Sequence, residues 1–177
     1  MATDSPEDAE RRQAIERELM RLEESAKYSA QGQFEQTKQW RGVNLGLGLP
    51  ASVLAAAAGA TALAATAGRI TAGILAITAA GFGAILTTVN ASHHMNQASS
   101  AANAYLEIQT AARQTREIDL PYMELDDARQ MLAELTARRD EQNKTAEPPN
   151  RRSYKRAKTN IEKAGGQDYG ADEKKGK

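Results

Sequence analysis

Cysteine is absent from this 177-residue chain, which excludes disulfide bonds and thiolate metal sites. Common enzyme motifs are absent as well: there is no Gly-x-Ser-x-Gly, no glycine-rich phosphate loop ending in Lys-Ser/Thr, and no His-Glu-x-x-His. The two histidines, His93 and His94, are adjacent, so on a helix they point about 100° apart and cannot share one metal ion. These absences predict a protein that is not an enzyme and that holds neither a cofactor nor a metal.

Charge is nearly absent from residues 42–92, where Arg69 is the one charged side chain. Arg69 divides this segment into two apolar stretches, at about 43–66 and 70–90. About 20 predominantly apolar residues are enough to cross the roughly 30 Å hydrocarbon core of a bilayer. The sequence therefore predicts a transmembrane helical hairpin over residues 42–92.

The lengths of the flanking segments predict the orientation of this hairpin. The connection at residues 66–69 is short, whereas both flanking arms are long and highly charged, so moving the connection across the bilayer costs less. Lys38 and Arg41 on the arm side, against Arg69 in the connection, agree with the positive-inside rule. We therefore expect a multi-pass membrane protein with both termini in the cytoplasm.

Aromatic, basic and imidazole side chains flank the two predicted spans. Trp40 and Arg41 precede the first span, and His93 and His94 follow the second. Side chains of these kinds are common at the membrane–water boundary, so all four are predicted to be interfacial. Alternatively, Trp40 is a core aromatic residue, and the histidines, which titrate near neutral pH, have a proton-sensitive or inter-subunit role.

Small side chains recur every four residues in both predicted spans. Small residues let helix backbones approach closely in lipid, so this face is expected to meet another helix. One interpretation is packing between the two helices of one hairpin. The other is oligomerisation around a pore, whose lumen the amides and hydroxyls of the spans would line. The candidate packing or pore face consists of Asn44, Gly48, Ser52, Ala72, Ala76, Ala80, Ala84 and Thr88.

Three segments outside the hairpin carry apolar residues at helical spacing. The N-terminal arm, residues 1–41, contains a helix that is predicted to begin at Pro6 with Ser5 as its cap. Residues 93–143 contain a stalk, which is expected to continue the second span until Pro121, and then an acidic helix. Each seam is too short to be stable alone, so we expect a small cytoplasmic bundle. The seams are Ile15, Leu19, Leu22 and Ala26; Ala98, Ala102, Tyr105, Leu106 and Ile108; and Leu125, Ala128, Leu132 and Leu135.

The C-terminal segment, residues 144–177, is basic. Within it, residues 151–163 (RRSYKRAKTNIEK) place Tyr154, Ala157 and Ile161 at helical spacing among six basic side chains. Such a helix lies on an anionic leaflet, contacts nucleic acid, or docks on the bundle with its lysines in solvent. Of these three alternatives, contact with nucleic acid is the least expected. From Gln167 onward the composition predicts a disordered polar tail.

Several of these segments resemble a known family. A charged N-terminal helix, two closely spaced spans, the stalk run AANAYLEIQTAARQTREIDL, an acidic helix and the closing run SYKRAKTNIEKAG are similar to the SLATT domains, two-transmembrane effector modules of bacterial conflict systems. The resemblance covers roughly residues 15–165. It implies an effector of the bacterial inner membrane that forms homo-oligomers and permeabilises the bilayer in abortive infection. Because these residues contain no fused nucleotide-sensing or nucleotide-producing domain, it also implies a separate sensor or nucleotide-signalling protein acting in trans.

The expected architecture is therefore all-α: a two-span transmembrane hairpin with a cytoplasmic bundle formed by the N-terminal arm, the stalk and the C-terminal helices. The expected function is a pore-forming anti-phage effector. The main alternative is a membrane-anchored oligomeric scaffold that recruits a cytoplasmic partner and forms no pore. A third interpretation is a soluble helical protein with a buried alanine-rich hairpin.

Overall fold

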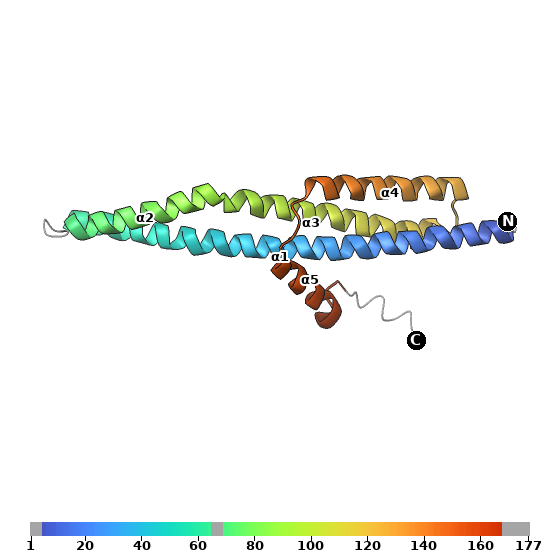
Figure 1. The fold of residues 1–177 in the computed structure, drawn as a ribbon, viewed down its shortest axis with the longest axis horizontal. Helices are drawn as coiled ribbons and strands as arrows, with labels where there is room; N and C mark the ends of the chain where they lie inside the picture. Colours follow the sequence, from blue (N-terminus) through green and yellow to red (C-terminus); the bar gives the residue numbers. More distant parts are fainter. Residues whose placement is uncertain (1–4, 65–68, 168–177) are drawn as a thin grey trace. The chain divides into compact units, whose positions relative to one another are not determined.

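The computed structural model describes residues 5–64 and 69–167 of the chain, and helices are its only regular elements (Figure 1). The described part contains no strand, so the predicted all-α class is confirmed. The elements are α1 (Pro6–Ala64), α2 (Arg69–Val89), α3 (Ala91–Gln114), the π-helical segment η2 (Thr115–Asp119), α4 (Leu125–Thr145) and α5 (Arg151–Ala164).

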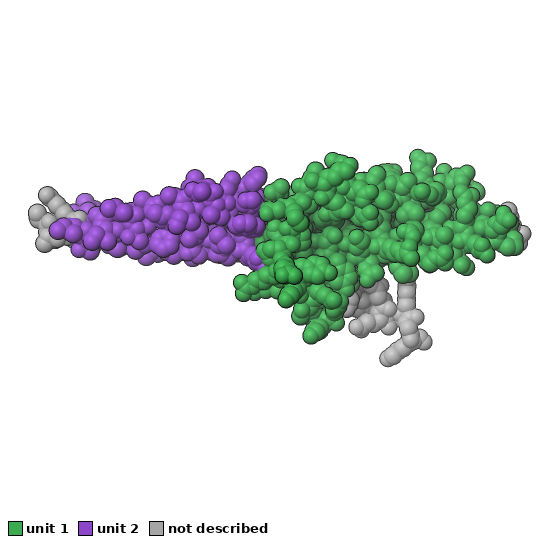
Figure 2. Space-filling model, viewed as in Figure 1, with its two compact units in different colours: residues 1–36, 97–177 green, residues 37–96 purple. Residues whose placement is uncertain are grey.

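These helices form two compact units (Figure 2). Unit 1 comprises Met1–Gln36 and Gln97–Lys177, and unit 2 comprises Thr37–Asn96. The segment predicted as a hairpin, 42–92, lies within unit 2. Most of the N-terminal arm and of the segments after the hairpin belongs to unit 1. The connection at 66–68 and the tail after Gln167 lie outside the described residues.

The start of α1 agrees with the capping prediction. The Ser5 Oγ accepts a hydrogen bond from the Asp8 backbone N–H at 3.2 Å, and the Ser5 hydroxyl donates to the Asp8 carboxylate at 2.8 Å. This satisfies one of the free donors of the first turn, where Glu7 and Asp8 also suit the positive end of the helix dipole. The helix contains Pro50 in its interior and continues beyond it.

The helix of the second predicted span is interrupted at Asn90 before the chain continues as the helical stalk, which corrects the prediction of one uninterrupted helix. Asn90 separates α2 from α3 and has a φ of 48°, in the left-handed region. Asparagine adopts this conformation more readily than most residues, so it can interrupt a helix in a segment that contains neither glycine nor proline. The Asn90 N–H still donates to the Leu86 carbonyl at 3.0 Å, and the His93 N–H donates to the Asn90 carbonyl at 3.0 Å.

The apolar seams of α1, α3 and α4 meet in one core in unit 1. Leu19 from α1 is fully buried, as is Ala128 from α4, and Leu135 and Ile108 are each 2% exposed. Burying a leucine or isoleucine side chain stabilises a fold by about 1.5–3 kcal/mol, so these residues carry much of the stability of the unit. Leu106 and Leu125 are only partly buried and pack against the edge of this core.

Polar contacts fix how the helices of unit 1 meet. The Arg12 guanidinium on α1 donates to the carbonyls of Leu120 and Met123 in the turn after η2. Arg116 in η2 forms an ion pair with Glu23 on α1, with 3.0 Å between Nη2 and Oε2. Both of these side chains are more than four-fifths buried, so the geometry of this pair is well defined.

Candidate functional site

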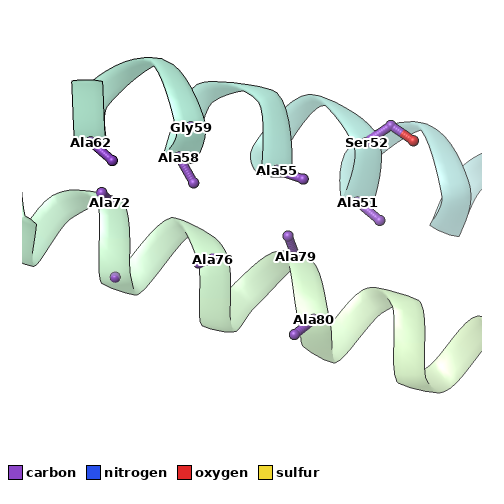
Figure 3. A pocket seen from close by; sticks show the side chains of 11 residues that line it. Ala51, Ser52, Ala55, Ala58, Gly59, Ala62, Ala72, Ala76, Ala79 and Ala80 are labelled. Atoms are coloured by element: carbon purple, nitrogen blue, oxygen red, sulfur yellow. The ribbon is translucent and has the colours of Figure 1, made fainter. Parts of the chain in front are cut away.

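The hairpin in unit 2 is held together by a seam with alternating spacings of three and four residues. On α2 the seam consists of the buried or half-buried positions 72, 75, 79, 82, 86 and 89, and on α1 of the positions 44, 47, 51, 54, 58 and 61; residues 48, 50, 57 and 83 beside the seam are also half-buried. Ala58, Ala72 and Ala79 are the most buried of them, at 7–8% exposed. Figure 3 shows Ala58 and Ala79 directed toward the opposite helix. Because these side chains are small, the two helices approach closely.

The predicted four-residue row therefore coincides only partly with the hairpin contact. Asn44 and Gly48 are half-buried and Ala72 is buried, but Ser52 is exposed. A four-residue step turns about 40° beyond a full helical turn, so such a row leaves the contact after one or two steps, whereas alternating steps of three and four remain in it. The exposed remainder on α2, which we name the small row, consists of Ala76, Ala80, Ala84 and Thr88.

Ala80 illustrates this difference in Figure 3, where its side chain points away from α1 while the neighbouring Ala79 points toward it. The small residues of both helices also line an open groove of about 750 Å³. Ala76 and Ala80 form part of its lining on α2, and Ala55 and Gly59 form part of it on α1. The small row thus adjoins a concave surface that lacks bulky side chains.

The outer surface of unit 2 is strongly apolar. Two helical segments are long and apolar enough to cross a membrane, and only 6% and 11% of the most apolar 18-residue stretch of each are buried inside the molecule. Large apolar side chains are each more than half exposed along both helices: Leu49, Val53, Leu63, Ile70, Ile74, Ile77 and Ile85. Contiguous exposed apolar surface of this kind marks a membrane or protein contact. The interpretation as a soluble protein with a buried hairpin requires these side chains to be covered, and they are exposed in the part of the chain that the structure describes.

Five hydroxyl groups of the predicted spans, which raised the possibility of a pore lining, are bonded within their own helices, and Thr66 lies outside the described residues. Ser52 donates to the Gly48 carbonyl at 2.9 Å. Thr61, Thr78, Thr87 and Thr88 each donate to the carbonyl four residues earlier at 2.8–2.9 Å. Such back-bonding satisfies a hydroxyl donor in lipid without water. These side chains therefore do not require a water-filled lumen. The contrast between small and bulky side chains is then the main indication of which face contacts another helix.

One end of the hairpin brings together the side chains that were predicted to be interfacial. The Trp40 and His94 rings stack with their centroids 4.7 Å apart and 16° between their planes. The Ser92 hydroxyl on α3 donates to the Asn44 Oδ1 on α1 at 3.2 Å. His93 and Arg41 are exposed beside this pair. Aromatic and polar contacts thus join α1 to α3 where the apolar surface ends.

The basic C-terminal helix, α5, docks on unit 1. Asn150 caps it, because its Oδ1 accepts hydrogen bonds from the backbone N–H groups of Arg152 and Ser153 at 3.0 and 2.9 Å. Ser153 is fully buried and Ala157 is 1% exposed. Tyr154, which was predicted to lie on the apolar face, is 57% exposed, because the spacing of Ser153 and Ala157 places their small side chains at the contact.

Side chains of α1 hold the segment before α5 in place. The Gln36 Oε1 accepts a hydrogen bond from the Asn150 N–H at 3.0 Å, and the Gln33 amide donates to the Glu147 carbonyl at 2.7 Å. A Cβ added to Gly32 would lie 3.2 Å from the Pro149 Cγ, so glycine suits this close approach. We refer to Gly32, Gln33, Gln36, Pro149 and Asn150 as the α5 clasp. The sequence did not lead us to predict these residues, although asparagine after Pro148-Pro149 is a helix-start signal.

Glu162 on the far half of α5 faces Tyr28 on α1. The Tyr28 hydroxyl donates to the Glu162 Oε1 at 3.5 Å, and Glu162 also pairs with the Lys158 ammonium at 3.8 Å. Desolvation, and to a smaller degree the Glu162 carboxylate, raise the pKa of Tyr28 above its usual range. A long contact between exposed groups contributes little, so the clasp and the small buried face are the main attachments of α5.

The structure thus defines an all-helical protein of two units, a polar helical bundle and a hairpin whose helices are apolar enough to cross a membrane. Within the described residues there is no group of three or more His, Asp or Glu side chains that could hold a metal ion. Comparisons with protein-family models, with curated proteins and with solved structures found no match.

Proposed function

We propose that this chain is a two-span effector of the bacterial inner membrane that oligomerises and permeabilises the bilayer. In this proposal both termini and the unit 1 bundle lie in the cytoplasm. The resemblance of residues 15–165 to SLATT domains supports a role in abortive infection, with a separate sensor or nucleotide-signalling protein as the trigger. The observation that carries the proposal is the surface of unit 2, where a row of small side chains lies exposed among bulky apolar ones.

The exposed apolar side chains support the membrane placement. Ile70, Ile74 and Ile77 are 79%, 61% and 75% exposed, and leaving such side chains in water is unfavourable by about 1.5–3 kcal/mol for each one that lipid would cover. Residues on both helices contribute to this surface, so a bilayer covers it more completely than a single protein partner would.

The small row supports association between copies. Ala76, Ala80 and Ala84 are not used by the hairpin contact, yet they place little bulk between their helix and any helix that approaches it. In lipid, helix association depends on close packing rather than on expulsion of water, and small residues allow the closest approach. The small row is therefore the surface of α2 best suited to an inter-subunit contact.

Membrane potential tests this proposal. We expect that a voltage-sensitive dye will report depolarisation in bacteria that express the chain, alone or with its genomic neighbours, and that Ala80→Leu will abolish it. Leucine at position 80 adds bulk to the small row without reducing the hydrophobicity of the span, so insertion should persist. Recovery of the variant in the carbonate-resistant membrane fraction checks insertion.

Ile74→Leu is the matched control, because it exchanges one exposed bulky side chain of α2 for another and leaves the small row unchanged. It should depolarise cells as the unmodified chain does. If Ala80→Leu depolarises equally, the small row is not the working contact. If no variant depolarises cells although all are in the membrane, the scaffold function is favoured, in which the spans only anchor a bundle that recruits a partner.

A further inference from the structure

The outward face of α5 carries a dense cluster of positive charge. Six basic side chains are exposed, and Glu162 is the one acidic residue of the helix. At 100° per residue, all six fall within an arc of about 160°, opposite the buried Ser153 and Ala157. We refer to these six residues as the basic face: Arg151, Arg152, Lys155, Arg156, Lys158 and Lys163.

The protein itself neutralises little of this charge. Within the described part of the chain, Lys158 is the one member of the basic face in an ion pair, at 3.8 Å from Glu162. The docked side of α5 cannot exchange places with the basic face, because Ser153 is fully buried and guanidinium or ammonium groups would be desolvated in its place. The basic face is therefore held toward the surroundings and available to an anionic partner.

The α5 clasp also limits how far this charge can lie from the apolar hairpin. Gln36, which accepts the Asn150 N–H, precedes Gly42 by only six positions in the chain. Six residues span at most about 20 Å even when fully extended. Whatever the arrangement of the two units, the N-terminal end of α5 is thus tied close to the beginning of the first span.

We propose that the basic face binds the anionic phospholipid headgroups of the membrane that the hairpin spans. This inference rests on the membrane placement in the proposed function, and it adds a lipid-recognition surface to that function. Clusters of Lys and Arg next to a span bind anionic leaflets, with each residue contributing a factor of about five to the affinity. The exposed Tyr154 ring flanks the basic face, and tyrosine favours the headgroup region.

The test uses the full chain reconstituted in vesicles of phosphatidylcholine alone or mixed with phosphatidylglycerol. Because the chain contains no cysteine, Thr159→Cys on the basic side of α5 accepts a single fluorophore, which is quenched by nitroxides on lipid headgroups. We expect stronger quenching in the mixed vesicles, reversed by high salt, which screens exposed charges. Replacing Arg151, Lys155 and Arg156 by glutamine should weaken headgroup binding about 100-fold and lower the quenching toward the phosphatidylcholine level.

Arg17→Gln, Arg129→Gln and Arg138→Gln together form the matched control, which removes the same charge from exposed positions on α1 and α4. This variant should keep the lipid dependence of the unmodified chain, and a fluorophore at Gln130→Cys on α4 should show no such dependence. Equal quenching in both vesicle types, or an effect of the control variant as large as that of the α5 variant, would overturn the proposal. Retention of the chain on duplex RNA or DNA without any response to phosphatidylglycerol would overturn it in favour of nucleic acid.

Flotation separates this proposal from the proposed function. Flotation of the chain with neutral phosphatidylcholine vesicles depends on the hairpin, whereas the response to phosphatidylglycerol depends on the basic face. Failure to float, with the phosphatidylglycerol response intact, would contradict membrane spanning and leave the lipid-binding face in place. Flotation without that response would retain the hairpin and refute the lipid-binding face.

Discussion

Arg12 and Arg11 are neighbours on α1 with different surroundings. Arg12 donates to two carbonyls of the turn after η2, one on Leu120 and one on Met123. Arg11 forms a 3.3 Å ion pair with Asp126, and both side chains of that pair are more than half exposed. Hydrogen bonds from charged donors contribute about 1.5–3 kcal/mol, whereas an exposed ion pair contributes about 1 kcal/mol or less.

We therefore expect Arg12→Ala to destabilise the protein by about 2 kcal/mol, because it leaves two carbonyls without their charged donor. For a chain of this length the midpoint of thermal unfolding falls by roughly 4–8 °C. Circular dichroism of the purified protein in detergent measures this midpoint. Arg11→Ala is the control and should change the midpoint by no more than about 2–4 °C. Equal shifts for the two variants would show that the Arg12 contacts contribute no more than an exposed ion pair.

Asn90 decides where α2, the helix of the second predicted span, ends. Its positive φ separates α2 from α3, and the backbone conformation disfavours residues with a branched Cβ. We expect Asn90→Gly to unfold at a midpoint close to that of the unmodified chain, because glycine adopts this conformation freely. Asn90→Val should lower the midpoint by several degrees, because holding a valine residue in the left-handed conformation costs roughly 1–2 kcal/mol. Thermal unfolding in detergent measures both variants. If Asn90→Val leaves the midpoint unchanged and increases the helix content measured by circular dichroism, the packing around residue 90 does not require an interruption between α2 and α3.

α2 as a whole shows why the hairpin contact was harder to predict than the bundle. In α1, α3 and α4 the seam residues stand out because Leu19, Ile108 and Leu135 are large and apolar among charged neighbours. Large apolar and charged side chains differ strongly in how favourably they interact with water, so the spacing of the apolar residues is enough to locate the core. In α2 nearly every side chain is apolar, so Ala79 and Ala80 are equivalent in composition. Only the position of α1 makes one of them buried and the other exposed.

The topology of the whole chain follows from the proposed placement of the hairpin. We expect Ala67→Cys, in the connection between the predicted spans, to react with a maleimide that cannot cross the inner membrane. The reagent is added to intact cells whose outer membrane has been permeabilised. Gln130→Cys, on α4 in the bundle, should react only after lysis. The absence of native cysteine makes each label specific to its position. The opposite labelling pattern would place the termini outside the cytoplasm, and labelling of both positions would contradict a membrane-spanning hairpin.

The helix start at Pro6, the apolar hairpin segment and the core seams of the bundle could all be predicted from local spacing and capping rules. Each of these features depends on residues within a few turns of one another, and their burial needs only a strong contrast between polar and apolar faces. The α5 clasp could not be predicted in this way. Gln36 and Asn150 are 114 residues apart, and nothing in either neighbourhood indicates the other.

Composition and periodicity were thus enough to determine the all-helical class, the two long apolar helices and the residues of the bundle core, because these depend on the partition of side chains between water and apolar surroundings. Three features were decided by tertiary packing: the burial of Ala79 rather than Ala80, the inward turn of Ser153 in place of Tyr154, and the attachment of α5 to Gln33 and Gln36. Hydrophobicity alone does not distinguish one small side chain from the next along these helices. Which of them is buried therefore depends on where a second helix packs, and not on the neighbouring residues in the sequence.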